Sequence, residues 1–246
     1  MHVLHTQSQR PLAQAARLVG YASSKQYQTR GSFIFAGIPL HGAHVLEVGC
    51  GPGTWVIWAA LHGAQRALGI EPEANGSTMA ILSQCTRNIK SLGLEHRVES
   101  SGHMLHELSR PKRPFDVVVM YDVINHLDEP AVERLHHDPA CAQRYITLLR
   151  HVYSLMQPGG WLIVADCART NFWAQLGLRA PLAPTIEWYK HQNPPLWVPL
   201  FVQAGFQLAD LRWSPLQPWP RLTANWFVQY LTCSHFVLRF RVPEPD

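Results

Sequence analysis

The chain has 246 residues, of which 47% are hydrophobic and 15% charged, a balance typical of a folded globular protein rather than a disordered one. Its formal net charge is +4, but Lys and Arg are scattered along the chain, which argues against a dedicated nucleic-acid binder. The five cysteines form no C-x-x-C pair, and no stretch has the character of a signal peptide or membrane span, so we expect a cytoplasmic protein with reduced thiols.

The first 40 residues are predicted to form a helical N-terminal appendage. Ala, Leu, Gln and aromatic residues recur at roughly helical spacing until Gly37 and Pro39 break the pattern. An amphipathic segment of this kind either packs on the core or closes as a lid over a ligand. If it is a lid, Tyr21 and Tyr27 are the expected ligand contacts.

A short apolar run ends in a glycine-rich turn with the sequence Glu47-Val48-Gly49-Cys50-Gly51-Pro52-Gly53, and a helix is predicted from Thr54 to about His62. Glycines at every second position leave the backbone open to a ligand and permit φ values that other residues avoid. The start of the helix adds free N–H groups. Thr54 stands where a dinucleotide fingerprint has its third glycine, which weakens a dinucleotide interpretation.

These residues resemble the first motif of the class I S-adenosylmethionine-dependent methyltransferases, E/D-x-G-x-G-x-G, without departure. The resemblance covers roughly residues 43 to 240. It implies an α/β fold with a Rossmann-like seven-stranded sheet, helices on both faces and an antiparallel last strand, in a domain over 41–246. It also implies S-adenosyl-L-methionine as the cofactor, with contacts on the turn from Glu47, Gly49, Cys50, Gly51, Gly53 and Thr54.

A second strand is predicted over residues 65–70, and it ends at Glu71 and Pro72. Glu71 comes about 20 residues after the turn, the spacing at which an acidic side chain receives a ribose in nucleotide-binding α/β folds. The alternative is that Glu71 is a solvated loop carboxylate. Because Glu71 stands at the end of a predicted strand, we assign it to the cofactor site, together with the neighbouring Pro72.

A helix over residues 74–92 and a third strand over 97–100 follow. The family that the chain resembles commonly has a Gly-Asp pair next, whose carboxylate meets the adenine amino group. This chain has Gly102 and His103 there, followed by Met104. Because a neutral imidazole can accept one hydrogen bond, these residues join the expected cofactor contacts. An exposed loop histidine is the alternative.

Residues 115–121 form the clearest predicted strand, since they are apolar and β-branched like a strand buried on both faces. Ligands of open α/β sheets bind outside the carboxyl ends of the strands. Tyr121, Asp122, Asn125 and His126 are therefore expected at the transferred group, with Tyr121 also near the cofactor. His126 is the candidate general base because imidazole titrates near neutral pH, although it could equally hold the loop.

The second half of the chain continues with a helix over about 140–156, a P-G-G turn and a strand over 161–165, followed by Asp166. Asp122 and Asp166 could together hold a divalent metal, but without a third ligand we expect no metal site. An aromatic- and proline-rich insertion is expected around 170–225, either to hold a flat acceptor or simply to pack. A helix over 194–204 and strands over 205–213 and 226–241 complete the prediction.

The leading function is methyl transfer from S-adenosyl-L-methionine to a small-molecule acceptor, aromatic or amino-acid-like, with secondary metabolism as one setting. One alternative is an enzyme that cleaves or cyclises the cofactor and releases methylthioadenosine. Another is an RNA methyltransferase or a nonenzymatic nucleotide-binding module, which the lack of a basic tract disfavours. We expect no membrane or nucleic-acid partner, and a monomer or a homodimer.

Overall fold

The computed structural model describes residues 3–73, 79–216 and 220–245. The chain divides into two compact units, Met1–Val119 and Met120–Asp246. Its strands follow the order β3-β2-β1-β4-β5-β7-β6 in one seven-stranded sheet, and β7 runs antiparallel to β5 and β6. This mixed sheet with an antiparallel last strand confirms the predicted fold class.

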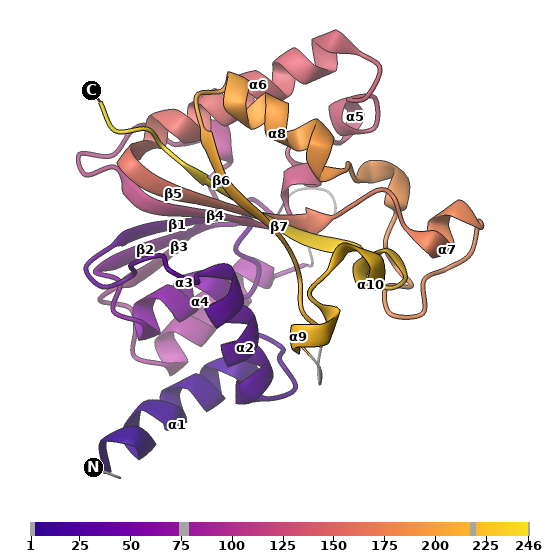
Figure 1. Cartoon of the computed structure of the whole chain (residues 1–246). Helices are drawn as coiled ribbons and strands as arrows, with labels where there is room; N and C mark the ends of the chain where they lie inside the picture. The colour runs from indigo at the N-terminus through magenta and orange to yellow at the C-terminus, as the bar shows by residue number, and fades with distance from the viewer. Residues whose placement is uncertain (1–2, 74–78, 217–219, 246) are drawn as a thin grey trace. The chain divides into compact units, whose positions relative to one another are not determined.

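The first unit consists of a parallel arrangement of short strands and their connecting helices (Figure 1). Strands β1, β2 and β3 pair in parallel, with His44 opposite Arg66 and Ala67 opposite Val98. The elements are α1 Val3–Leu18, α2 Ser24–Ile34, β1 His44–Val48, α3 Thr54–Leu61, β2 Arg66–Ile70, α4 Ile81–Ser91, β3 Val98–Ser101, η1 Leu105–Glu107 and β4 Phe115–Tyr121, which reaches the second unit.

Helix α3 is the centre of the first unit's core. Trp55 and Trp58 are fully buried, and the ring of Tyr27 from α2 lies 6.1 Å from that of Trp55 and 5.1 Å from that of Trp58. A Cβ on Gly31 of α2 would overlap the Trp58 indole, so the glycine lets the two helices approach closely. The N-terminal helices thus contribute to this core by packing.

The second unit pairs a long strand with two antiparallel neighbours. Phe236 of β7 lies opposite Asp166 of β5 and Trp213 of β6. Helices α6 and α8 lie side by side (Figure 1), where the rings of Tyr145 and Trp197 are 5.2 Å apart. The elements are η2 Ile124–His126, α5 Glu129–Val132, α6 Pro139–Leu155, β5 Met156–Cys167, α7 Phe172–Gln175, η3 Trp188–Lys190, α8 Pro194–Gln203, β6 Gln207–Trp213, α9 Pro220–Thr223, α10 Trp226–Tyr230 and β7 His235–Arg241.

The predicted strand over 226–241 is wrong in its first half. Trp226–Tyr230 is a helix, because the side chain of Asn225 accepts a hydrogen bond from Val228 N at 3.1 Å and caps its start. Ser234 then turns the chain at φ 49°, and the strand begins only at His235. The aromatic composition of residues 226–230 fits a helix as well as a strand, and the capping hydrogen bond of Asn225 favours the helix.

Two other predicted elements have different limits. The predicted helix over 74–92 is observed as Ile81–Ser91, and its residues 74–78 lie outside the described part of the chain. Strand β5 begins at Met156, before the P-G-G turn, because Gly159 N donates to Val242 O at 2.9 Å and Val242 N donates to Gly160 O at 3.0 Å. Because of these two hydrogen bonds, the residues of the P-G-G turn belong to strand β5.

Candidate active site

The glycine turn of the first unit is open on its outside and tightly packed beneath. Gly49, Gly51 and Gly53 have φ values of 68°, 49° and 89°. A Cβ on Gly51 would meet no described atom within 4 Å, whereas one on Gly53 would lie 2.8 Å from the Sγ of Cys85. The turn therefore offers bare backbone to a ligand and fits closely against α4.

Glu47 lies beneath this turn. Its side chain is 2% exposed, and its Oε2 accepts hydrogen bonds from Trp55 N at 3.0 Å and Val56 N at 2.8 Å. Burial raises the pKa of Glu47 well above its ordinary value, and the two backbone donors oppose that shift. Glu47 thus ties the end of β1 to the first turn of α3.

Glu71 stands at the end of β2 beside the open turn. Its Oε2 accepts a hydrogen bond from Gly51 N at 3.0 Å, and its residue is 8% exposed, while Pro72 is half-buried. A carboxylate next to bare backbone suits a ligand that carries hydroxyl groups, as the ribose of S-adenosyl-L-methionine does. The residues of the first unit therefore fit this cofactor.

The segment after β3 is exposed to solvent. His103 Nδ1 lies 2.5 Å from the Oγ of Ser101, which leaves Nε2 of the imidazole for a ligand. Gly102 and Met104 flank it, and Met104 is 42% exposed. This geometry is compatible with the adenine contacts that the sequence predicts.

The two N-terminal tyrosines differ in their access to a ligand. Tyr27 is fully buried, and its hydroxyl donates to Thr54 O at 2.6 Å, so this side chain fixes the start of α3 from within the core. Tyr21 is half-buried, with its ring 5.0 Å from that of Tyr27. Of the pair, Tyr21 is the one with surface to offer a cofactor. Cys50 is buried beneath the turn, 4.0 Å from Cys85 by sulfur-to-sulfur distance.

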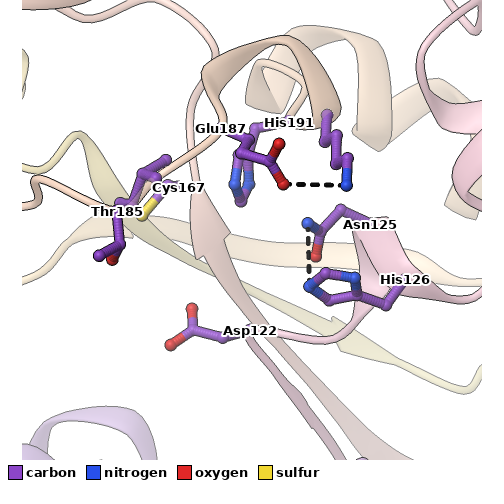
Figure 2. A pocket seen from close by; sticks show the side chains of 9 residues that line it. Asp122, Asn125, His126, Cys167, Thr185, Glu187 and His191 are labelled. Atoms are coloured by element: carbon purple, nitrogen blue, oxygen red, sulfur yellow. Dashed lines mark hydrogen bonds and ion pairs between the residues drawn. The ribbon is translucent and has the colours of Figure 1, made fainter. Parts of the chain in front are cut away.

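The second unit contains a pocket of about 270 Å³ that gathers three of the predicted catalytic residues (Figure 2). The fourth predicted catalytic residue, Tyr121, is not among the residues that line this pocket. Its ring lies 5.3 Å from that of His235. The lining residues are Asp122, Asn125, His126, Cys167, Thr185, Ile186, Glu187, Lys190 and His191.

Asp122, which lines the pocket directly after β4, has a strained backbone conformation. Its φ is 52°, in the left-handed region that non-glycine residues seldom adopt. Its N–H donates to Ala165 O at 2.9 Å, and its Oδ1 lies 3.3 Å from His235 Nε2. Strain held in place by neighbouring contacts is typical of functional sites, where it fixes the direction of a side chain.

His126 lines the pocket, and 46% of its side chain is exposed. Its Nδ1 lies 2.7 Å from Glu129 Oε1, and its Nε2 lies 3.4 Å from Asn125 Nδ2. The hydrogen bond from His126 lowers the pKa of Glu129, and Lys190 adds to the effect from 3.2 Å. Lys190 also pairs with Glu187 at 2.9 Å.

Sequence reasoning missed a second pair of a histidine and a carboxylate, His191 with Asp166, which is more deeply buried than His126 with Glu129. His191 Nδ1 lies 2.9 Å from Asp166 Oδ1, although the two residues are 25 positions apart. Asp166 is fully buried at the end of β5, and its Oδ2 lacks a hydrogen-bond partner among the described residues. No motif spacing links a strand-end carboxylate to a histidine in an irregular loop, so only the position of Asp166 gave a signal.

Metal-ligating side chains do not converge in the described residues. Within them, no group of three or more His, Cys, Asp and Glu side chains is arranged to hold an ion. Asp166, one of the two carboxylates considered from the sequence, instead contacts His191 and accepts the N–H of Cys167 at 2.7 Å.

The seven-stranded mixed sheet and the glycine turn at the end of β1 define an α/β protein of the Rossmann-like type. The family described as "Methyltransferase domain" matches residues 12–211 in sequence, and the chain belongs to this family. It is an S-adenosyl-L-methionine-dependent methyltransferase, as the motif of the glycine turn predicted.

Solved structures share the fold. The chain is similar to an S-adenosylmethionine-dependent methyltransferase from Aquifex aeolicus, with a TM-score of 0.60 and 13% identity over 94% of this chain and 98% of that one. It is also similar to one from Mesorhizobium loti, with a TM-score of 0.59 and 16% identity over 91% and 99% of the two chains. The [4+2]-cyclase SpnF matches with a TM-score of 0.59 and 16% identity over 91% of this chain and 82% of that chain.

Sequence relatives include the ubiquinone biosynthesis O-methyltransferases of Xylella fastidiosa strain 9a5c and Xanthomonas campestris strain B100. The first is 27% identical over 216 residues, which cover 83% of this chain and 78% of the relative, and the second is 26% identical, covering 83% and 81%. In the portion of the chain that the structure describes, no helix has both the length and the apolar character needed to cross a membrane.

Proposed function

We propose that this enzyme transfers the methyl group of S-adenosyl-L-methionine to a hydroxyl oxygen of a small molecule. The observation that carries the proposal is the pocket, which holds two imidazoles, each hydrogen-bonded to a carboxylate. A hydroxyl is a weak nucleophile until a base takes its proton, and imidazole is suited to that task near neutral pH. The relatives named O-methyltransferases support an oxygen acceptor.

The first unit supplies the cofactor contacts in this proposal. Glu71 receives the ribose, the backbone from Gly49 to Gly53 accommodates the amino-acid end, and Gly102, His103 and Met104 surround the adenine. Glu47 and Tyr27 hold the start of α3 in position from beneath, through hydrogen bonds to the backbone of Trp55, Val56 and Thr54. The bound cofactor provides an electrophilic methyl group on a sulfonium.

The acceptor in this proposal is a ring-sized molecule. An apolar cavity of about 150 Å³ is known to hold benzene, so the pocket of about 270 Å³ has room for a substituted ring. Asn125 is 2% exposed, and its Oδ1 is buried without a hydrogen-bond partner in the described ranges, which leaves an acceptor for a ligand hydroxyl. A ring with neighbouring hydroxyls matches this lining.

The test is to identify the nucleoside product by mass spectrometry. The protein is incubated with S-adenosyl-L-methionine alone and then with catechol, phenol, benzyl alcohol, thiophenol and benzylamine in turn. We expect S-adenosylhomocysteine only with an acceptor, and with a hydroxyl compound. Methylthioadenosine formed without an acceptor would instead show a cofactor-cleaving or cyclising enzyme, a reaction class that the fold alone does not exclude. Product with the thiol or amine only would contradict the oxygen acceptor.

We also assign the enzyme to the cytoplasm, because all five cysteines are free thiols in the structure and four of them are buried.

Light scattering of the purified chain distinguishes the monomer from the homodimer that we consider. Salt-dependent binding to RNA, measured by fluorescence anisotropy, would revive the RNA methyltransferase alternative.

A further inference from the structure

The two histidines of the pocket differ in how their ring nitrogens are engaged. His126 uses both of them, since Nδ1 faces Glu129 and Nε2 faces the amide nitrogen of Asn125. An amide N–H can only donate, so it occupies the lone pair that a base needs. His126 is also the more solvated of the two, with 46% of its side chain exposed. It is therefore poorly placed to take a substrate proton.

His191 has one ring nitrogen left for a ligand. Its Nδ1–H donates to Asp166 Oδ1 at 2.9 Å, which fixes the tautomer that keeps the lone pair on Nε2. Only 13% of its side chain is exposed, and it lines the pocket beside Glu187, across from Asn125 and His126 (Figure 2). We infer that His191, oriented by Asp166, is the general base that removes the hydroxyl proton of the acceptor. This inference rests on the proposed function.

Asp166 acts as a positioning residue because of where it is buried. Its Oδ1 accepts from His191 and from Cys167 N, while Oδ2 has no hydrogen-bond partner among the described residues. Burial raises the pKa of Asp166, and the hydrogen bond and charge of His191 oppose that shift. The ionised Asp166 in turn favours an imidazolium beside it. Glu129, the partner of His126, is 32% exposed and shares its charge with Lys190, so its field on the ring is weaker.

The carboxylates around His191 raise the pKa of its imidazole. Burial lowers the pKa of His191, but the hydrogen bond and charge of Asp166, together with the charges of Asp122 and Glu187, raise the pKa above its ordinary value. The other titratable or charged groups that face the pocket are Asp122 after β4, Cys167 on β5, Glu187 and Lys190 on its own loop, and His126 across the pocket.

The reaction step balances with these groups. The hydroxyl oxygen forms a bond to the methyl carbon as the carbon–sulfur bond breaks, and the bonding pair stays on sulfur. The hydroxyl proton moves to His191 Nε2, and the resulting imidazolium is stabilised by Asp166 until it releases the proton to water. Proton transfer by a positioned base contributes about 10²- to 10⁴-fold to a rate.

The first test measures the imidazole directly and needs no acceptor. The full chain, labelled with ¹⁵N-histidine, is titrated by NMR with and without S-adenosyl-L-methionine, and H191Q and H126Q assign the two rings. We expect neutral His191 to carry its proton on Nδ1, with a pKa above the ordinary value of about 6.5 that falls in D166N. A proton on Nε2, or a pKa that D166N leaves unchanged, would overturn the dyad.

The second test compares turnover, with catechol as the probe acceptor. We expect H191Q to lose about 10²-fold or more in kcat while its affinity for S-adenosyl-L-methionine, measured calorimetrically, is retained. H126Q should lose less, and H137Q, a change at an exposed loop histidine outside the pocket, serves as the neutral control. D166N should move the acidic limb of the kcat profile to lower pH.

The outcomes separate this inference from the proposed function. If H126Q loses more turnover than H191Q, methyl transfer to oxygen stands and the assignment of His191 is wrong. If the wild-type enzyme methylates no hydroxyl probe, the proposed function fails, and the NMR titration still decides whether Asp166 orients His191.

Discussion

Replacing Gly53 by Ala tests how the glycine turn is held against α4. Two effects oppose the substitution. The φ of 89° is left-handed, which costs about 1–2 kcal/mol for a residue with a Cβ. The new Cβ would also lie 2.8 Å from Cys85 Sγ and 3.2 Å from Ile57 Cδ1, and overpacking of this kind costs about 1–3 kcal/mol. We expect G53A to lose about 2–5 kcal/mol of unfolding free energy.

Gly20 provides the matched control, because its φ of 88° is nearly identical and a Cβ there meets no described atom within 4 Å. G20A should therefore show the backbone strain alone. The difference between the two variants, about 1–3 kcal/mol, isolates the contact with Cys85 and Ile57. Adding C85A to G53A should recover part of the loss, since the substitution removes the sulfur atom.

The measurement is urea unfolding of the unsubstituted chain, G53A, G20A, C85A and G53A/C85A, followed by tryptophan fluorescence and circular dichroism, with the slope m compared before the midpoints are converted to free energies. Equal losses in G53A and G20A would refute the packing argument and leave strain as the whole effect. A G53A/C85A double variant no better than the sum of its single changes would refute the part assigned to Cys85.

Other predictions concern the residues around the same turn. E47Q should lose about 1–3 kcal/mol in urea unfolding, because a buried amide replaces the carboxylate that receives two backbone N–H groups; an unchanged midpoint would argue against that role. Y27F should lose about 1 kcal/mol by removing the hydrogen bond to Thr54 O, and a loss of cofactor affinity with no loss of stability would instead indicate a direct contact. E71Q should weaken S-adenosyl-L-methionine binding about tenfold or more in calorimetry, with a smaller effect on unfolding, and retained affinity would exclude Glu71 from the ribose site.

The cofactor side of this enzyme is predictable from sequence because its signals are local. Glu47 and the glycines lie within a few residues of one another, and Glu71 follows at a spacing set by one strand-helix-strand unit. The role of Glu47 was less visible, since only the structure shows that its carboxylate is buried under α3. Spacing predicted these residues for the cofactor site, and the structure shows the backbone hydrogen bonds that Glu47 and Glu71 accept.

The acceptor side was harder to predict, for the opposite reason. Asp122, Asn125 and His126 follow one strand, and their position predicted that they would lie together, whereas His191 reaches the same pocket only through a long irregular segment. Its partner Asp166 was visible at a strand end, but their contact depends on how the loop folds back. The helix Trp226–Tyr230 was missed because aromatic composition does not distinguish it from a strand.

The central claim is that the methyl group reaches a hydroxyl oxygen, and isotope labelling tests it most directly. S-adenosyl-L-methionine with a deuterated methyl group is incubated with the enzyme and catechol, and the product is analysed by mass spectrometry and NMR. We predict an intact CD₃ group bound to oxygen, with S-adenosylhomocysteine formed in equal amount. A CD₃ group on a ring carbon, or labelled methylthioadenosine with unmodified catechol, would contradict the account.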